Sequence, residues 1–454
     1  MMRMEKKEQQ FGLMTAITMI VGICIGSGIF FKGDDILRFT GGSVALGVLV
    51  LCIGAFSIIF GSISLTELSV RTEKSGGVVG YFEEFISTEM ASAFGWFQML
   101  LYFPTINVVV AWAAGIYTLM VLGIEGSLEL QILIGLGYLL FFYFLNYLSN
   151  RLGGYFQIIS TYVKLVPLIG IALIGLFWTK DAPAIPETMT KVPLTNVGMG
   201  WLAALAPVAF SYDGWSVATS ITNEVKNPKK TMPLALTIGP LIVLVVYLSY
   251  FIGLTGILGP EFVLAVGDQA IYSIGQLLFG AHGGTIITLF VVISVLGVTN
   301  GLAMGNLRMP HALASKKMMP NADKILGTNK LKTMTPRSFR LSLGCALFWM
   351  FIHYLTQKMG IMAGGDISEI AIVFSYICYP ILYVKIIKMK LSGEIKSTFK
   401  GLIAPVLGIL GSAIIVVGGI VSNPVYVSIF IVICFLVCAY GYYYYATTKK
   451  RSLS

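Results

Sequence analysis

Two short polar interruptions lie within apolar segments of this 454-residue chain, and both contain residue types that could bind a small solute. The first is Gly26-Ser27-Gly28. Glycine costs about 1 kcal/mol relative to alanine within a helix, so two glycines around a serine favour local unwinding. Hydrocarbon cannot satisfy the freed N–H and C=O groups, so such a break must be paired by protein or line a polar cavity. We interpret it as half of a binding site; a glycine face for helix packing is the alternative.

The second interruption is the stretch Phe210-Ser211-Tyr212-Asp213-Gly214-Trp215. A carboxylate beside a serine and a glycine is costly at membrane depth unless the helix opens there. The half-helices at such breaks offer free N–H groups to a carboxylate and free carbonyls to an ammonium, and an amino acid has both groups. We therefore predict a substrate-binding site for a zwitterionic solute, with residues Gly26, Ser27, Gly28, Phe210, Ser211, Asp213 and Gly214 from the two breaks.

Lys164 is a charged residue within the fifth apolar segment. It follows Gly153 by eleven residues, about 16 Å along a helix, which places it near the membrane midplane. A lysine at that depth must pair with carbonyls or a carboxylate, or release its proton. Two coupling roles follow: a fixed ammonium in place of a bound cation, bracing the first and eighth spans, or a proton carrier. A lysine that merely faces a wet crevice is the structural alternative.

Three side chains near the breaks have two interpretations each. Tyr247 directs its hydroxyl to the pocket or is a core tyrosine with a local partner. Phe210 caps the pocket as a gate or only packs. Asp213 faces the substrate, which would favour cations, or holds the unwound backbone; we favour the backbone role. Phe210, Ser216 and Tyr247 are the side chains expected to determine which amino acid fits.

The composition predicts a polytopic membrane protein. The chain is 56% hydrophobic and 11% charged, with a mean hydropathy of +0.84, well beyond ordinary soluble domains. The N-terminus is polar and lacks a cleavage site after a short apolar core, which indicates a retained first span. We expect twelve spans, at about 11–37, 42–66, 92–122, 129–148, 154–178, 198–222, 233–258, 284–314, 338–357, 366–388, 402–421 and 424–446.

The distribution of positive charge predicts the orientation. If the N-terminus is cytoplasmic, five of the 31 Lys and Arg residues lie on the outer face (Lys32, Arg38, Lys180, Lys191 and Lys358), Lys164 lies in a span, and the other 25 are cytoplasmic. This positive-inside bias predicts cytoplasmic termini and accounts for the net charge of +10 without a nucleic-acid partner.

The two breaks fall in the first and sixth spans, five spans apart. Because five is odd, a repeated five-span unit has inverted topology, and paired broken helices indicate the binding site of a transporter. We predict an all-α fold: a cytoplasmic N-terminus (1–10), a first repeat (11–180), a second repeat (198–390), two further helices (400–446) and a cytoplasmic C-terminus (447–454). An interfacial helix is expected near Tyr81–Phe85, and the external segment 259–283 is either a folded lid or a plain interfacial helix.

Neither a metal site nor a cofactor is predicted. The six cysteines all lie in apolar runs, where they pack as small hydrophobic residues, and the three histidines are scattered over loops and span ends. An enzyme that uses Lys164 to form a Schiff base lacks an accompanying acid or base cluster, so no enzymatic activity is expected. A channel or membrane sensor is a further alternative, but a channel needs a continuous polar lining and intramembrane charges are few.

At these residues the chain resembles the amino acid, polyamine and organocation (APC) superfamily, in its L-type amino acid transporter branch. The resemblance spans nearly the whole chain. It rests on Val21–Phe30, on Leu65-Thr66-Glu67-Leu68 with Ser75-Gly76-Gly77, on Phe210–Trp215, and on Glu224–Pro228 leading to Met232-Pro233.

The resemblance implies two inverted five-helix repeats plus two helices, with alternating access. It implies substrate carboxylate on the backbone at Gly26, Ser27 and Gly28, and substrate ammonium on carbonyls near Ile23, Phe210 and Ser211. Lys164 matches a fifth-span lysine of members that work without sodium, and Tyr247 a tyrosine that assists the substrate. The chain is similar to bacterial exchangers of small neutral amino acids such as alanine, serine, cysteine and threonine.

The predicted function is sodium-independent exchange of small neutral L-amino acids in the plasma membrane, with proton-coupled symport through Lys164 as the alternative. The connection near 123–128 has no cysteine, so a disulfide-linked accessory subunit is not expected, and we expect a monomer in the lipid bilayer.

Overall fold

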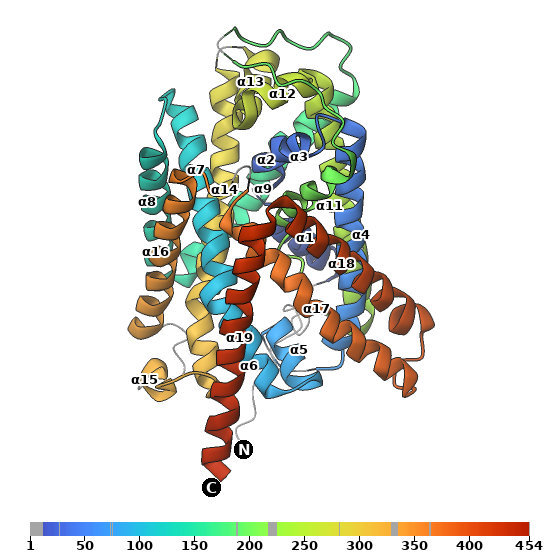
Figure 1. The fold of residues 1–454 in the computed structure, drawn as a ribbon, viewed down its shortest axis with the longest axis vertical. Helices are drawn as coiled ribbons and strands as arrows, with labels where there is room; N and C mark the ends of the chain where they lie inside the picture. The colour runs from blue at the N-terminus through green and yellow to red at the C-terminus, as the bar shows by residue number, and fades with distance from the viewer. Residues whose placement is uncertain are drawn as a thin grey trace.

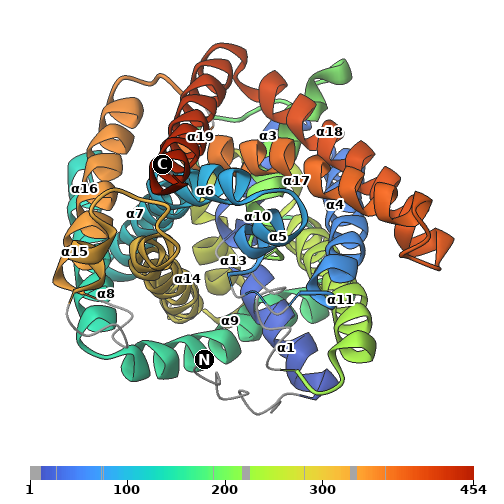
Figure 2. The ribbon, with the colours of Figure 1, turned by 90° about the horizontal axis from the view of Figure 1, so that it is seen from below.

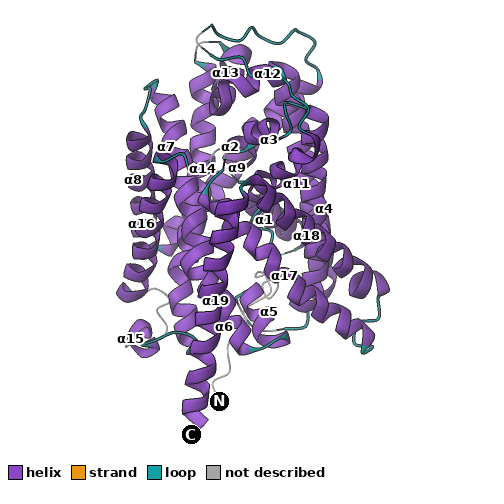
Figure 3. Ribbon diagram, viewed as in Figure 1, coloured by secondary structure: helices purple, strands orange, loops and turns teal. Residues whose placement is uncertain are grey.

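The protein is a bundle of helices in a computed structural model (Figure 1). The structure describes residues 12–26, 28–72, 74, 76–187, 189–216, 225–280, 282–327, 335–362 and 365–453. Within these ranges the regular elements are helices, and none is a strand (Figure 3). The all-α class predicted from composition is confirmed for this part of the chain.

Two of the spans are divided into short helices. The first consists of α1 (Leu13–Cys24), α2 (Gly28–Phe31) and α3 (Gly33–Phe39), and the second of η2 (Gly198–Ala204) and α10 (Leu205–Ser211). The longer elements are α4 (Val44–Ser69), α6 (Thr88–Phe97) continued by η1 (Gln98–Tyr102) and α7 (Phe103–Leu122), α8 (Leu128–Leu148), α9 (Asn150–Leu176), α11 (Pro228–Leu258), α14 (Gly283–Ser315), α16 (Pro336–Lys358), α17 (Ile367–Leu391), η5 (Phe399–Ile403) with α18 (Ala404–Ser422), and α19 (Pro424–Leu453).

Among the described residues, 11 helical runs are long and apolar enough to cross a membrane. One of them, Pro260–Phe279, is bent into α12 (Pro260–Val266), η4 (Gly267–Gln269) and α13 (Ala270–Phe279), and it lies at the opposite end from α5 and α15 (Figure 1). The others, together with the two divided spans, agree with the predicted twelve. The protein is therefore a multi-pass membrane protein.

One end of the bundle carries many of the basic side chains. This end is formed by α5 (Val78–Phe85), α15 (Ala322–Leu326) and the C-terminal part of α19, and we call it the basic end (Figure 1). There Glu83 of α5, in the predicted interfacial helix, accepts hydrogen bonds from Lys74 (3.0 Å) and from Lys316 after α14. Burial raises the pKa of Glu83, but these lysines outweigh it and hold the pKa below its ordinary value. Glu83 thus ties α5 to the end of α14.

The opposite, far end is covered by α3, α12 and α13 (Figure 1). A Cβ on Gly275 of α13 would lie 2.6 Å from the carbonyl oxygen of Gly283, so α13 packs backbone to backbone on the start of α14. The predicted external segment is therefore a folded cap of two helices at the far end, which favours the lid over the plain interfacial helix. Seen from the basic end, α10 lies near the centre and α8, α16 and α18 near the periphery (Figure 2).

Candidate functional site

The first break is present where the sequence predicts it. Helix α1 ends at Cys24, Ile25 has an extended backbone (ψ 100°), and α2 begins at Gly28. Ser27 lies outside the described residues, and the side chain of Ile23 is not described either. Because α2 starts a new helix, its first N–H groups have no partner within that helix and point toward the break.

The second break follows α10, which ends at Ser211. Residues 212–216 form a turn in which Gly214 has a φ of 95°, a conformation that glycine adopts without strain. Residues 217–224 lie outside the described part of the chain, so only the half-helix before this break is described. Its last residue, Ser211, lies against the start of α2.

The two breaks meet through their backbones. A Cβ on Gly28 would lie 2.4 Å from the Cα of Ser211, so any larger side chain would push α2 and α10 apart. The hydroxyl oxygen of Tyr247 lies 3.0 Å from the carbonyl oxygen of Cys24 and 2.8 Å from that of Ser211. This fully buried hydroxyl therefore joins the ends of α1 and α10. Tyr247 has the local partners of the core-tyrosine alternative, and those partners are the two broken helices themselves.

A cavity of about 280 Å³ lies beside this junction. The predicted site residues Gly26, Gly28, Phe210, Ser211, Asp213 and Gly214 line it, together with Gly22, Cys24, Tyr102, Phe103, Ile106, Val110, Gln157, Lys164, Val298, Gly301, Leu302 and Gly305. The structure thus brings residues of both breaks and Lys164 to one pocket. Tyr247 is absent from this lining, because its hydroxyl points between the half-helices.

Lys164 is 2% exposed and donates a hydrogen bond from Nζ to the carbonyl oxygen of Gly22, at 2.5 Å. This contact joins α9 to α1 just before the first break. Helix α9 also packs closely on α14, where a Cβ on Gly297 would lie 2.2 Å from the Oγ of Ser160. The lysine itself contacts the first span, and other residues of its helix contact the eighth.

Asp213 accepts a hydrogen bond from the hydroxyl of Tyr102, at 2.6 Å. Tyr102 is the last residue of η1, a π-helical turn that interrupts the long helix α6–η1–α7. A π-turn shifts the register of a helix and often lies at a functional site. Ser216 is buried against Tyr379, whose hydroxyl lies 3.2 Å from its Oγ, and it does not line the pocket.

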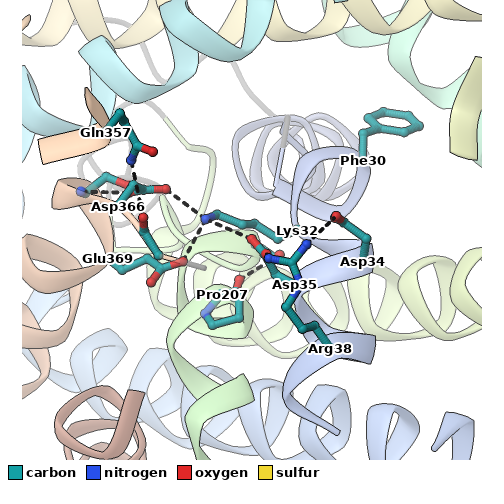
Figure 4. Close-up of polar contacts among 12 residues, drawn as sticks. Phe30, Lys32, Asp34, Asp35, Arg38, Pro207, Gln357, Asp366 and Glu369 are labelled. Atoms are coloured by element: carbon teal, nitrogen blue, oxygen red, sulfur yellow. Dashed lines mark hydrogen bonds and ion pairs between the residues drawn. The ribbon is translucent and has the colours of Figure 1, made fainter. Parts of the chain in front are cut away.

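Phe210 lines the pocket and lies beside a buried ion-pair cluster at the far end, whose side chains are drawn in Figure 4. The ammonium of Lys32, 5.5 Å from the centre of the Phe210 ring, forms the middle of this cluster. Lys32 Nζ lies 2.8 Å from Asp366, 2.7 Å from Glu369 and 3.3 Å from Asp35. The ion-pair cluster, defined as Lys32, Asp35, Asp366 and Glu369, joins the first divided span to α17.

The pocket extends from the breaks toward the basic end. Gly22 precedes the break in α1, Gln157 lies near the start of α9, and Gly305 lies near the end of α14, and all three line it. No member of the ion-pair cluster does. The structure is therefore closed at the far end by Phe210 and the ion-pair cluster, with its pocket on the side of the basic end.

Sequence reasoning missed Tyr102 and the ion-pair cluster. On sequence alone, Lys32 counts only among the charges of the outer face, although Asp34 and Asp35 follow it directly and α3 continues the span. Asp366 and Glu369 stand at the predicted start of the tenth span, three residues apart and so on one helix face, which is a signal that was available. Tyr102 gave no such signal among the 22 tyrosines.

A solute-sized pocket between two broken helices, at the centre of a twelve-helix bundle, is the architecture of a secondary transporter. The model of the amino acid permease family matches residues 11–439. The chain belongs to this family, within the APC superfamily, as its motifs predict.

Among curated relatives, the serine/threonine exchanger SteT of Bacillus subtilis is 28% identical over 98% of both chains. The b(0,+)-type amino acid transporter 1 of Homo sapiens is 26% identical, covering 94% of this chain and 86% of that protein. Among solved structures, MhsT in complex with L-phenylalanine has a TM-score of 0.54 and 14% identity, covering 95% of this chain and 99% of that one. That similarity shows the fold, which is the LeuT fold.

We predict that Gly28→Ala lowers transport about tenfold or more. The new Cβ would overlap Ser211, and moving α2 and α10 apart to relieve that overlap should cost at least about 1.4 kcal/mol. Gly33→Ala is the matched control, since a Cβ at Gly33 meets no atom within 4 Å. Both variants are compared by uptake of labelled amino acid into liposomes that contain equal amounts of folded protein. Equal activity of the two variants would contradict the close contact of the breaks.

We predict that Lys32→Gln opens the far end, because removing one partner from a buried ion network costs about 3–5 kcal/mol. The measurement is alkylation of Cys24, which lines the pocket, in a variant whose other cysteines are replaced by alanine. An impermeant thiol reagent applied on the far-end side should react about tenfold faster than in the parent, since about 1.4 kcal/mol already gives that factor. Lys191→Gln, at an exposed lysine outside the ion-pair cluster, should leave the rate unchanged. Unchanged alkylation in Lys32→Gln would rule out this role of the cluster.

Proposed function

We propose that this chain is a sodium-independent exchanger of small neutral L-amino acids that works by alternating access in the plasma membrane. The observation that carries the proposal is the pocket at the junction of the two breaks, with the ammonium of Lys164 hydrogen-bonded to the Gly22 carbonyl. The relationship to a serine/threonine exchanger supports both the exchange mode and the substrate class.

The main-chain groups of the breaks suit the two ends of an amino acid. The substrate carboxylate binds at the N-terminus of α2, on the N–H groups of Gly28 and of the preceding Gly26 and Ser27. The ammonium binds carbonyls near Ile23 and Phe210. The Ser211 carbonyl, also predicted as an acceptor, is hydrogen-bonded to Tyr247, and the substrate shares or replaces that contact.

The pocket favours a small and neutral side chain. Its volume of about 280 Å³ lies at the lower limit of the roughly 300–1,000 Å³ usual for small-molecule sites. Its acidic lining residue is Asp213, whose carboxylate accepts the Tyr102 hydroxyl at 2.6 Å. We assign Asp213 to positioning the unwound turn, together with Gly214, rather than to binding a substrate cation.

Lys164 takes the place of a bound cation. Its fixed ammonium polarises the carbonyl end of α1 next to the first break, where a sodium ion would otherwise bind main-chain oxygens. In this role the charge remains with the protein through the cycle, so transport needs no sodium gradient. Exchange then follows because the reorientation of the pocket requires a bound amino acid.

The orientation and the assembly are part of the proposal. The basic end carries Lys74, Lys316, Lys324, Arg337 and Lys449, and this charge supports a cytoplasmic location by the positive-inside rule. The described state, closed at the far end, then faces inward. We further propose that residues 11–180 and 198–390 are inverted repeats, and that the protein acts as a monomer without a disulfide-linked subunit.

A proton-coupled symporter is the second candidate. It is favoured by the surroundings of Lys164: among the described residues, no carboxylate lies within ion-pair distance of its buried ammonium. A buried ammonium without a counter-ion releases its proton more readily than one in water. Loss and recovery of that proton during the cycle would couple uptake to a proton gradient.

We predict that proteoliposomes preloaded with unlabelled alanine take up labelled alanine about tenfold faster than empty ones, with or without sodium, because an empty pocket reorients slowly. A tenfold preference corresponds to about 1.4 kcal/mol between the barriers of the loaded and empty carrier. Equal uptake by loaded and empty vesicles would contradict exchange.

The same vesicles distinguish a proton-coupled symporter from an exchanger. Uptake into empty vesicles that is driven by an inward proton gradient, and that is lost in Lys164→Ala, would favour proton coupling. Lys180→Ala, at an exposed lysine far from the pocket, is the matched control and should behave like the parent.

A further inference from the structure

A groove lies on the outer surface between η1, α16 and α19, away from the substrate pocket. Its volume is about 420 Å³, and its lining includes Leu100 and Leu101 of η1 and Ile433 and Val437 of α19. Helices α16 and α19 lie at one edge of the bundle, near α6 and α7 (Figure 2), and η1 joins α6 to α7. Trp349 of α16 contacts both η1 and α19: its Nε1 donates to the Leu100 carbonyl at 2.6 Å, and its ring packs on Phe430 of α19.

One face of α16 forms the floor of this groove. The lining residues come in pairs one turn apart, Arg340 with Leu341, Gly344 with Cys345, and Phe348 with Trp349. Residues four apart lie on the same side of a helix, so the groove runs along α16. From the first pair to the last it extends about 12 Å, close to the ~15 Å depth of one hydrocarbon leaflet.

Gly344 leaves the middle of the groove open. A Cβ at this position would meet no atom within 4 Å, so close helix packing does not explain the glycine. Glycine in a helix interior lowers helix stability. Toward the C-terminal end of α16 the lining residues are large and apolar, with Phe348 exposed and Trp349 buried. The groove therefore offers an apolar channel that the protein itself does not fill.

The mouth of the groove at the basic end is positively charged. Arg340 lines it and is exposed, and no carboxylate of the described residues lies within ion-pair distance of its guanidinium. Arg337, one turn earlier, donates to the Lys324 carbonyl at 2.6 Å instead. An apolar channel of leaflet depth with a cation at its mouth matches a molecule that has an acyl chain and an anionic headgroup.

We propose that this groove binds an anionic phospholipid, with its phosphate on the Arg340 guanidinium and one acyl chain along Gly344 to Trp349. Arginine binds phosphate oxygens through paired N–H groups. A helix of a second protein copy is about 10 Å wide and would not enter a channel of this size. The lipid comes from the leaflet at the basic end, where the proposed orientation places the anionic cytoplasmic surface.

The bound chain would contact the outer side of η1, whose inner side belongs to the substrate site. Leu100 and Leu101 line the groove, and the next residue, Tyr102, lines the pocket and donates to Asp213. A lipid that packs against this π-turn stabilises the position of Tyr102. This consequence for transport and the choice of leaflet rest on the proposed function, whereas lipid binding in detergent does not.

The test is native mass spectrometry of the detergent-purified protein with phosphatidylglycerol or phosphatidylethanolamine of identical acyl chains. We expect tighter binding of phosphatidylglycerol and about fivefold weaker binding in Arg340→Gln, the effect of about one cationic contact with an anionic surface. Arg337→Gln is the matched control and should bind as the parent does. Gly344→Leu should also weaken binding by filling the channel, while Gly344→Ala, which keeps it open, should not.

Several results would overturn the proposal. Equal binding of the two lipids, or equal loss in the Arg337 and Arg340 variants, would indicate a non-specific lipid shell. A dimer that separates in Gly344→Leu would assign the groove to a second copy. Thermal unfolding of each variant shows whether it is folded. If Gly344→Leu is not folded, the comparison of Arg340→Gln with Arg337→Gln still tests the proposal. Weak lipid binding together with intact exchange would contradict this inference alone, since exchange tests the proposed function separately.

Discussion

The backbone contact between Gly28 and Ser211 is the constraint on which the rest of the structure depends. Two helices that stop in the middle of a membrane expose main-chain groups that hydrocarbon cannot satisfy. Here the two ends lie against each other, close enough that a Cβ on Gly28 would overlap Ser211, and the Tyr247 hydroxyl lies between the carbonyls of Cys24 and Ser211. The remaining free groups face a pocket of about 280 Å³. The long helices around this junction exclude lipid and keep it polar.

The pocket is closed by charge at the far end, and its lining extends toward the basic end. Lys32 lies among three carboxylates and above Phe210, so the far end is held by buried ion pairs and an aromatic ring. Burying these charges costs desolvation free energy in the closed state, and the ion pairs break together when the first span and α17 separate. The cluster is therefore either fully formed or absent. Toward the basic end the lining is mostly small or apolar, as at Gly301 and Gly305. The two sides of the pocket therefore differ in chemistry: ion pairs and an aromatic ring at the far end, and small or apolar residues toward the basic end.

Much of this account could be predicted from the sequence, because breaks in apolar runs are visible without neighbours. The glycines of the first break, Asp213 and Lys164 all line the predicted pocket. What the sequence does not show is which helices become neighbours. The Tyr247 hydroxyl has the break carbonyls as its partners. Ser216, expected to help select the substrate, lies against Tyr379 in this structure. The pairing of Lys32 with Asp366 joins residues 334 positions apart, which no local pattern indicates.

The most direct test of the central claim is a cryo-electron microscopy structure of the protein with bound L-alanine. The account predicts one amino acid at the junction of the breaks, with its carboxylate at about 2.7–3.2 Å from the backbone N–H groups at the start of α2 and its ammonium facing the carbonyl ends of α1 and α10. Tyr247 should still contact Cys24 or Ser211. An amino acid bound elsewhere, or held at this junction by side chains with no main-chain contact to either break, would contradict it.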